Sequence, residues 1–439
     1  MFCSVISAVL CGISAEQVVC EADVSEGMPG FSMVGFVSAQ VKEAQDRVKT
    51  ALRNLGFSLP PKRITINLAP GDLRKDGSRF DLPIAAAVLM ALGKFPPEAL
   101  KDTMVLGELH LDGRVGGVTG VLPSVIKARE IGCQSCLVPL ENVREGQVVE
   151  GIRVVGIASL QQLLEFLRTG DLPDVRTAEE AGEKAACYDV DFGEVCGQEA
   201  AKRAAVIAAS GFHNLLLAGP PGSGKSMTAS RIPTILPPLT REESLEISQI
   251  YSVAGLLPTE TPLLRLRPFR APHYTISASA LCGGGLYPRP GEITLAHRGV
   301  LFLDEIPEMR GRTLELLRQP MEEREILISR SGGNYRYPAS FLLVAAMNNC
   351  PCGKYPDLDR CTCTPTQIAA YRHRISQPLL ERIDLQVQVA AADYDSLAGG
   401  SKGGATSAEL RAQVEAAMAI QQDRYANTGI TFNSELRSG

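Results

Sequence analysis

The sequence predicts an α/β protein with two folded domains and the beginning of a third, helical part. Its 439 residues are enough for two or three domains at roughly 150 residues each. Strand-like apolar segments alternate with segments of helical spacing through most of the chain, a pattern typical of mixed folds with parallel strands. The predicted parts are an α+β domain at 1–168, a linker at 169–187, an α/β domain at 188–391 and the start of a helical lid at 392–439.

Composition and charge exclude several classes of protein. Hydrophobic residues make up 45% of the chain, far more than a disordered protein carries. No uninterrupted apolar run reaches the roughly 20 residues that span a bilayer, and Met1–Ile13 lacks the basic residues of a secretory signal. We therefore expect a cytoplasmic protein without a membrane partner. Because 44 basic and 49 acidic residues give a net charge of −5, nucleic acid could be bound only where basic residues gather on one surface.

The first domain is expected to combine a sheet with helices. Helical spacing predicts helices at Ala39–Leu55 and Leu82–Leu92, and in the second of these Leu82, Ala86 and Leu89 share one face. Alternating apolar residues predict strands at Ser4–Leu10, Gln17–Asp23 and Ile64–Ala69.

Two polar segments are predicted to connect folded parts. Arg168–Lys184 is charged and has no periodicity, which favours an interdomain linker. Leu397–Ser407 is rich in glycine and serine and is predicted to be a hinge before a helix at Ala408–Tyr425.

The clearest motif is a glycine-rich loop that reads GPPGSGKS at residues 219–226. It matches GxxxxGK[ST] at every fixed position, follows an apolar strand predicted at Asn214–Ala218, and opens a helical stretch. In such a loop the backbone N–H groups turn toward nucleotide phosphates, Lys225 adds positive charge beside the β- and γ-phosphates, and the Ser226 hydroxyl can ligate magnesium. The predicted ATP-binding residues are Gly219, Pro220, Pro221, Gly222, Ser223, Gly224, Lys225 and Ser226.

Two further apolar strands predict catalytic groups. The strand at Gly299–Leu303 ends in Asp304 and Glu305, and an acidic pair at the end of a buried strand is costly unless it has a function. In P-loop ATPases such an Asp orients the magnesium shell and such a Glu polarises the attacking water. A third strand, predicted at Phe341–Ala346, leads into Asn348, whose amide could hold that water. Without the other two motifs, Asn348 would more often be a turn residue.

Four of the twelve cysteines form the pattern C-x-C-x8-C-x-C. Two thiol pairs that close a short polar loop have the number and type of ligands of a structural zinc site. The alternative is four reduced thiols in an exposed loop, which would be an oxidation liability. For Cys133 and Cys136, a CxxC pair in an apolar setting, we expect packing rather than redox or metal chemistry. The predicted zinc ligands are Cys350, Cys352, Cys361 and Cys363, and the small core residues are Cys3, Cys11, Cys20, Cys187, Cys196 and Cys282.

Basic residues gather in two places. The segment Arg265–Arg298 has five arginines and two histidines but only one acid, Glu292, and predicts either a nucleic-acid surface or salt bridges between subunits. Ile328–Pro338 is predicted to be a β-hairpin whose turn is Ser-Gly-Gly-Asn. Arginine can bind phosphates and tyrosine can stack on bases, and the residues of these types near its tip or on its strands are Arg330, Tyr335, Arg336 and Tyr337.

The order and the amino-acid sequences of these motifs resemble those of AAA+ ATPases over essentially the whole chain. Two segments, RPFRAPHYTIS and GEITLAHRGVLFLDE, are more specific and resemble the magnesium-chelatase-like AAA+ proteins of the ComM/YifB family. The segments that carry the general resemblance are DFGEVCGQEAAKRA at Asp191–Ala204, GPPGSGKS, LFLDEIPE at Leu301–Glu308, MNN and LLERIDL at Leu379–Leu385.

The resemblance implies a ring, usually a hexamer, with ATP and magnesium at the subunit interfaces. It places an arginine finger, which acts on the neighbouring subunit's ATP, at Arg382; without the motif, a surface pair with Asp384 would be the better interpretation. It also implies that the Ile328–Pro338 hairpin projects into the central pore, where the predicted nucleic-acid contacts are Arg330, Tyr335, Arg336 and Tyr337. Family members carry a later arginine in the lid, and no matching motif precedes Gly439, so the predicted lid is incomplete.

The first domain resembles the catalytic domain of Lon proteases, through LRKDGSRFDLPIAAAVL and the segment from Val105 to Gly132. Lon-type hydrolysis needs a serine nucleophile and a lysine base. Alignment places Arg79 at the nucleophile and Leu122 at the base, and Ser78 is one residue away from the required position. We therefore expect a Lon-like scaffold without protease activity.

Together these features predict an ATP-hydrolysing ring motor that acts on single-stranded or branched DNA. By resemblance, its function would be branch migration of recombination intermediates in natural transformation. The alternative is a chelatase-type motor that remodels a partner protein for metal insertion. No DxSxS metal-adhesion motif occurs in the chain, and chelatase motor subunits lack the Lon-like domain.

Overall fold

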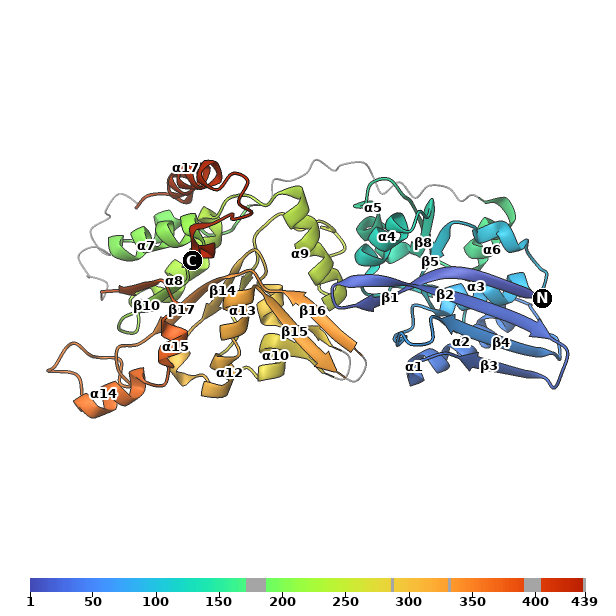
Figure 1. Ribbon diagram of the computed structural model, residues 1–439, viewed down its shortest axis with the longest axis horizontal. Helices are drawn as coiled ribbons and strands as arrows, with labels where there is room; N and C mark the ends of the chain where they lie inside the picture. The colour runs from blue at the N-terminus through green and yellow to red at the C-terminus, as the bar shows by residue number, and fades with distance from the viewer. Residues whose placement is uncertain (171–186, 286–287, 331–332, 391–403, 437–439) are drawn as a thin grey trace. The chain divides into compact units, whose positions relative to one another are not determined.

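A computed structural model describes residues 1–170, 187–285, 288–330, 333–390 and 404–436 of the chain. The predicted linker and hinge fall largely outside these residues. The chain forms two compact units (Figure 1), described separately below. Unit 1 comprises Met1–Glu183, Ser248–Leu263 and Ser329–Tyr335, and unit 2 comprises Lys184–Ile247, Leu264–Ile328 and Arg336–Gly439.

Unit 1 contains a seven-stranded mixed sheet in the order β3-β4-β2-β1-β5-β8-β9. Two long strands, β1 and β2, form an antiparallel hairpin, whereas β5, β8 and β9 pair in parallel. The three strands predicted in this domain are confirmed. The strands of the sheet are β1 (Phe2–Cys11), β2 (Ser14–Ser25), β3 (Gly30–Val34), β4 (Arg63–Ala69), β5 (Thr103–Val105), β8 (Ser135–Pro139) and β9 (Arg153–Ile157), and β6 (Glu108–Leu109) pairs with β7 (Val115–Gly116).

The helices of unit 1 differ from the predictions in two respects. The helix predicted at Ala39–Leu55 is broken at Glu43. The helix predicted at Leu82–Leu92 buries every residue rather than one face, because it is apolar all round. The helices are α1 (Ala39–Lys42), α2 (Ala44–Asn54), α3 (Asp81–Ala91), α4 (Val121–Glu130), α5 (Val143–Gln147) and α6 (Leu160–Thr169).

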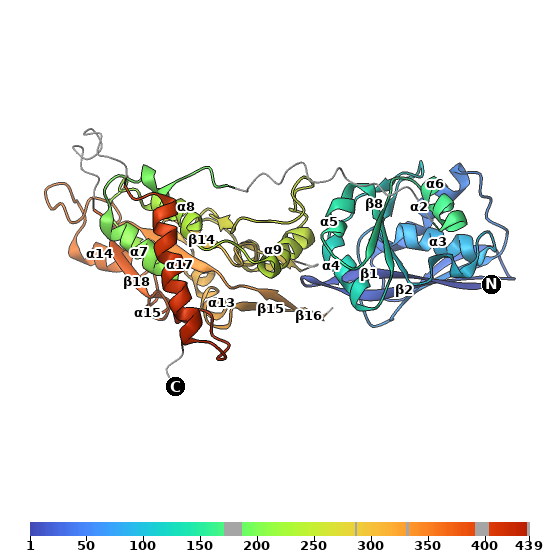
Figure 2. The ribbon, with the colours of Figure 1, turned by 90° about the horizontal axis from the view of Figure 1, so that it is seen from above.

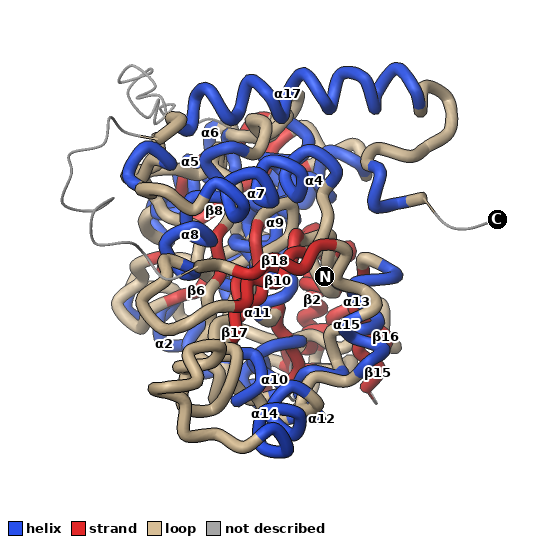
Figure 3. The backbone as a smooth tube through the Cα atoms, turned by 90° about the vertical axis from the view of Figure 1, so that its left-hand side faces the viewer, coloured by secondary structure: helices blue, strands red, loops and turns tan. Residues whose placement is uncertain are grey.

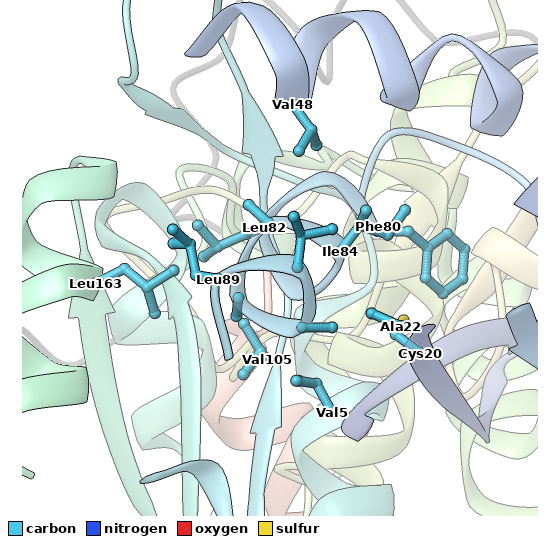
Figure 4. Packing of buried hydrophobic residues seen from close by; sticks show 14 of the residues in the cluster. Val5, Cys20, Ala22, Val48, Phe80, Leu82, Ile84, Leu89, Val105 and Leu163 are labelled. Carbon is cyan, nitrogen blue, oxygen red and sulfur yellow. The ribbon is translucent and has the colours of Figure 1, made fainter. Parts of the chain in front are cut away.

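The core of unit 1 is built around α3. Figure 4 shows Leu82, Ile84 and Leu89 of this helix among side chains such as Val5 and Val105 from the sheet. The one charged residue of the helix, Asp81, is also buried, and Arg47 holds it with two hydrogen bonds of 2.6 and 2.9 Å. This pairing allows a carboxylate to occupy the core.

Unit 2 contains a five-stranded sheet in the order β11-β14-β17-β10-β18, and all of its strands run parallel. The strands predicted before the three ATP motifs are confirmed as β10, β14 and β17. Because the strands are parallel, the segments that follow them emerge at one edge of the sheet. The strands of the sheet are β10 (Leu215–Ala218), β11 (Phe269–Arg270), β14 (Val300–Leu303), β17 (Leu342–Met347) and β18 (Leu385–Gln388), and β12 (Gly283–Gly284) pairs with β13 (Arg289–Pro290). A further pair, β15 (Glu325–Arg330) and β16 (Gly333–Pro338), is divided between the units.

Helices α7, α8 and α17 lie on one side of this sheet (Figures 1 and 3), and α17 packs against α7 and α8, as Figure 2 shows. Helix α17 begins at Ser407 with a capping box formed by Thr406 and Glu409, so the helix predicted at Ala408–Tyr425 is confirmed. The helices of unit 2 are α7 (Glu199–Gly211), α8 (Lys225–Ile235), α10 (Ala278–Cys282), α11 (Glu292–Leu295), α12 (Gly311–Glu315), α13 (Arg318–Glu323), α14 (Pro365–Arg372), α15 (Gln377–Leu380) and α17 (Ser407–Arg424), and α9 (Arg241–Ala254) is divided between the units.

Within the described ranges, no helix combines the length and apolar character needed to cross a membrane.

Candidate functional site

The glycine-rich loop lies between the end of β10 and the start of α8. Gly222 and Gly224 have φ values of 75° and 85°, a backbone conformation that residues with a side chain rarely adopt. A Cβ on Gly219 would lie 2.4 Å from the carbonyl oxygen of Val389. Two of these glycines are therefore required by backbone conformation and the third by close packing against the end of β18.

Lys225 is the first residue of α8, and its side chain folds back over the loop. Its Nζ donates to the carbonyl oxygens of Gly219 and Pro220 at 2.8 Å each and to Asn348 Oδ1 at 3.3 Å. Burial lowers the pKa of Lys225, and the carboxylates of Asp304 and Glu305 oppose this shift. The ammonium group thus lies among acceptors, beside a loop shaped for anions.

The next residue, Ser226, connects α8 to the end of β14. Its Oγ donates to Asp304 Oδ2 at 2.8 Å, while Asp304 Oδ1 accepts the backbone N–H of Glu305 at 2.8 Å. Hydroxyl and carboxylate oxygens are the ligands that magnesium prefers, so this pair fits the predicted magnesium site. Glu305 has a φ of 49° and an exposed side chain. A non-glycine residue in this conformation stores strain, which occurs often at functional sites.

Asn348 completes the group at this edge of the sheet. It follows β17, which lies between β14 and β10, and its amide oxygen faces Lys225 as described. Arg372 of α14, which no sequence motif singled out, donates to the carbonyl oxygen of the adjacent Asn349 at 3.4 Å. Burial, and after it Glu308, raises the pKa of the neighbouring Tyr371 to about 12. Lys225, Ser226, Asp304, Glu305 and Asn348 are therefore brought together from three neighbouring strands.

Arg382 is not part of this group. It precedes β18, whereas the glycine-rich loop follows β10, and these two strands are parallel neighbours, so the two segments lie at opposite ends of the strands. Its guanidinium group bonds to Glu322 and to the carbonyl oxygen of Pro378. The alternative pair with Asp384 is not formed; that carboxylate contacts His213 at 3.3 Å.

The four predicted zinc ligands form a cluster in which all four sulfur atoms lie within 4.8 Å of one another. Cys350 Sγ lies 3.4 Å from Cys352 Sγ and 3.8 Å from Cys361 Sγ, and the last two sulfurs are 3.7 Å apart. A tetrahedral site with metal–sulfur bonds of about 2.3 Å has sulfur–sulfur distances of about 3.8 Å. The cluster therefore has the donor type and nearly the size of a tetrathiolate zinc site.

Only two of the six cysteines predicted as core residues, Cys3 and Cys20, are buried. Cys187 and Cys196 are exposed, so the expectation was wrong for them, and Cys11 and Cys282 are only half-buried. Cys133 and Cys136 are both buried and unbridged, and burial raises the pKa of each thiol. Protonated, buried thiols of this kind are inert, as the packing interpretation requires.

The predicted hairpin forms from β15 and β16, although Ser331 and Gly332 of its turn lie outside the described residues. Arg330 and Arg336 are exposed, and Arg336 pairs with Glu325 of the same hairpin at 3.7 Å. The prediction that Tyr337 contacts nucleic acid was wrong. Its side chain is fully buried and its hydroxyl donates to the Pro288 carbonyl oxygen at 2.7 Å, so its ring cannot stack on a base.

The basic segment Arg265–Arg298 is largely neutralised within unit 2. Arg267 is buried and donates to Glu243 at 3.1 Å, and Arg298 donates to Glu246 at 3.1 Å. Arg270 makes a bidentate pair with Glu292 at 2.6 and 2.7 Å. The salt bridges expected between subunits are thus formed inside one chain, because α9 supplies acids that lie outside the segment in sequence.

In unit 1, the two residues aligned with the Lon protease dyad are both buried. Arg79 donates to the carbonyl oxygen of Thr119 at 2.5 Å, and burial lowers the pKa of its guanidinium group to about 10. Leu122 has no exposed surface. Ser78 donates to Glu108 at 2.5 Å, and a carboxylate partner does not provide the lysine base of Lon-type hydrolysis.

Comparison with known proteins adds the family. Residues 191–397 match the family model of magnesium chelatase, subunit ChlI, and residues 20–142 match that of subunit ChlI of Mg-chelatase. A match to Lon protease 2 of Bacillus subtilis, at 28% identity, covers 29% of this chain and 23% of that protein, which gives the Lon-like interpretation of unit 1 only weak support.

Three relatives align with nearly the whole chain. An uncharacterized protein of Mycobacterium tuberculosis strain H37Rv is 43% identical over 97% of this chain and 84% of its own length. The competence protein ComM of Haemophilus influenzae is 42% identical over 97% of this chain and 83% of its own. The uncharacterized protein YifB of Escherichia coli is 42% identical over 94% and 81% of the two chains. At this identity over nearly its whole length, the chain belongs to the ComM/YifB family of magnesium-chelatase-like AAA+ proteins.

Proposed function

We propose that the protein is an ATP-hydrolysing AAA+ ring motor that acts on DNA, of the kind that moves branch points in recombination. The observation that carries the ATPase part is the convergence of Lys225, Ser226, Asp304, Glu305 and Asn348 at one edge of the unit 2 sheet. The name of one relative, competence protein ComM, supports a role in DNA uptake or recombination.

In the proposed reaction, water attacks the γ-phosphorus as the bond to the β–γ bridging oxygen breaks, which yields ADP and phosphate. Lys225 and the loop N–H groups hold the phosphates, and Asn348 and Glu305 orient and polarise the water. Magnesium, held by Ser226 and Asp304, would neutralise charge that develops on the phosphate oxygens.

A complete site needs a second subunit. Arg382 lies at the opposite end of the strands from its own chain's glycine-rich loop, and an arginine so placed could act only on the ATP of a neighbour. This supports a ring, with a hexamer as the expected size for this family, in which each subunit contributes an arginine to the next site.

For DNA, the proposed contacts are Arg330 and Arg336, which are exposed, and Tyr335, which is half-buried, all on the hairpin. The second candidate, a chelatase-type motor for a partner protein, is favoured by the chelatase family models and differs in what the hairpin would bind.

The remaining parts are proposed to support the motor. Residues 1–168 would be a Lon-like scaffold without protease activity, 169–187 a linker, 188–391 the ATPase core and 392–439 part of the lid. The four clustered cysteines would hold one structural zinc ion, and the protein would act in the cytoplasm.

The experiment is ATP hydrolysis with and without single-stranded or branched DNA. We expect the purified protein to hydrolyse ATP and DNA to stimulate turnover, and Glu305→Gln, which keeps the phosphate contacts, to bind ATP without turnover. A turnover rate that DNA does not change would remove the DNA part of the proposal and leave the chelatase-type alternative.

A further inference from the structure

The loop that contains the cysteine cluster, residues 350–363 and called the cysteine loop below, touches the nucleotide site directly. Gly353, with a φ of 75°, packs against the glycine-rich loop so closely that a Cβ would lie 2.8 Å from Pro221 Cδ and 2.9 Å from its Cγ. Residues of both loops, among them Pro220, Pro221 and Tyr355, also line one cavity of about 960 Å³. Because the two loops are in contact, the cysteine loop restricts where Pro221 of the glycine-rich loop can lie.

The cysteine loop is also continuous with Asn348. Cys350, the first thiol, is buried only two residues after Asn348, and its Sγ accepts the backbone N–H of Tyr355 at 3.4 Å. The intervening Asn349 donates to the carbonyl oxygen of Tyr355 at 3.3 Å. The turn that follows Asn348 is thus built around the first sulfur of the cluster.

The far end of the cysteine loop returns to the turn that follows Asn348. Directly after Cys363, Thr364 caps α14 with a capping box, and Arg372 of this helix donates to the carbonyl oxygen of Asn349 at 3.4 Å. A metal ion that joins the two thiol pairs would therefore fix both chain segments that hold this turn, together with Gly353, which packs against Pro221.

We infer that zinc bound by Cys350, Cys352, Cys361 and Cys363 positions the nucleotide site, so that its removal weakens nucleotide binding. On binding, the thiols lose their protons as the zinc–sulfur bonds form. Without the ion, the only covalent constraint on the 350–363 segment is the chain itself, and Gly353 is free to leave Pro221. Because coupling between two ligands is reciprocal, nucleotide must in turn strengthen zinc binding by the same factor. This inference rests on the proposed ATP site.

The test combines metal analysis with binding of a fluorescent ATP analogue. We expect about one zinc per chain in the reduced protein, and about tenfold weaker nucleotide binding after chelation, restored by added zinc. Cys361→Ser with Cys363→Ser should lose both zinc and affinity, whereas Cys187→Ser with Cys196→Ser, at exposed thiols, should lose neither.

A second variant tests the contact between Gly353 and Pro221 without removing the metal ligands. Gly353→Ala introduces the clash with Pro221 and should weaken nucleotide binding about tenfold while zinc remains at about one per chain. Gly429→Ala is its matched control, because Gly429 has the same φ of 75° but an added Cβ would meet no described atom within 4 Å. ATP should also lower the fraction of zinc that a competing chelator removes at equilibrium from the wild type, and should not do so for Gly353→Ala.

Unchanged nucleotide affinity after zinc removal would overturn the inference and leave the proposed ATP site intact, as would freshly reduced protein that contains no metal. Zinc-loaded wild type that binds no nucleotide would instead overturn the ATP site, and the inference with it.

Discussion

Ser226 Oγ donates a 2.8 Å hydrogen bond to Asp304 Oδ2, which joins the start of α8 to the end of β14 across 78 positions of sequence. The contact exists because β14 and β10 run parallel with β17 between them, so their carboxyl ends share one edge. A hydroxyl and a carboxylate that converge in this way can provide two ligands of a magnesium site. The neighbouring residues Lys225 and Glu305 are expected to have different roles, in ATP binding and in turnover.

The first prediction separates binding from turnover. Lys225→Ala removes the ammonium that contacts phosphate in the ground state, so ATP affinity should fall about a hundredfold. Glu305→Gln keeps shape and hydrogen bonding but cannot polarise the water, so affinity should stay within about twofold while kcat falls at least about a hundredfold. Equilibrium binding and single-turnover kinetics measure the two effects. Equal losses of affinity in both variants would contradict these roles.

The second prediction concerns action between subunits. Arg382→Ala should bind ATP normally but hydrolyse it about a thousandfold more slowly, as expected for loss of an arginine finger. Mixing it with Lys225→Ala subunits should restore some activity. An intact site forms wherever a subunit that retains Lys225 meets a neighbour that retains Arg382. Glu322→Gln is the matched control: it removes the negative charge that pairs with Arg382 in its own chain but leaves the arginine, so hydrolysis should persist. Mixed rings that stay inactive, although both variants oligomerise, would show that Arg382 does not act in trans.

The sequence predicted that Lys225, Ser226, Asp304, Glu305 and Asn348 lie together, because the signals for this grouping are local. Each strand and the polar residues after it are contiguous, and the parallel order alone then assembles them. The ion pairs of Arg267 and Arg298 could not be predicted in this way, since Glu243 and Glu246 lie on a helix outside the basic segment. Such pairing depends on tertiary packing, not on neighbours in sequence.

The burial of Tyr337 had a detectable signal. Side chains alternate along a strand, so Arg336 and Tyr337 must face opposite sides of β16. An exposed Arg336 therefore implies an inward Tyr337, and the structure has this arrangement.

The third prediction concerns Glu246 of α9, which pairs with His297 and Arg298. Burial opposes ionisation of Glu246, but His297 and Arg298, each 3.1 Å away, outweigh it and lower the pKa of Glu246 from 4.5 to about 2. A carboxyl pKa that is lower in the folded than in the unfolded state stabilises the protein. This stabilisation is complete when the pH is above the unfolded-state pKa, and it is lost as the pH falls through the folded-state pKa. The stability difference between wild type and Glu246→Gln should therefore shrink by about 2 kcal/mol as the pH falls from 4.5 to 2, allowing for partial exposure.

Urea unfolding of both proteins across this pH range measures the difference. Glu415→Gln, at an exposed position of α17, is the control and should track the wild type at every pH. A difference between wild type and Glu246→Gln that does not vary with pH would show that Glu246 is not held ionised by these partners.

The last prediction tests the DNA part of the proposed function. Arg330→Ala combined with Arg336→Ala should weaken DNA binding and reduce the slope of log K against log salt by about two, because each lost phosphate contact removes about one. Basal ATP hydrolysis should survive, since neither side chain is assigned to the nucleotide. Tyr337→Phe is the matched control on the same hairpin: it removes a buried hydroxyl that donates to the Pro288 carbonyl oxygen, removes no charge, and should leave the salt slope unchanged. A chelatase-type motor predicts no effect of the double variant on DNA, only altered coupling to a partner protein. DNA affinity and a salt slope equal to those of the wild type would therefore favour the chelatase-type alternative over a DNA motor.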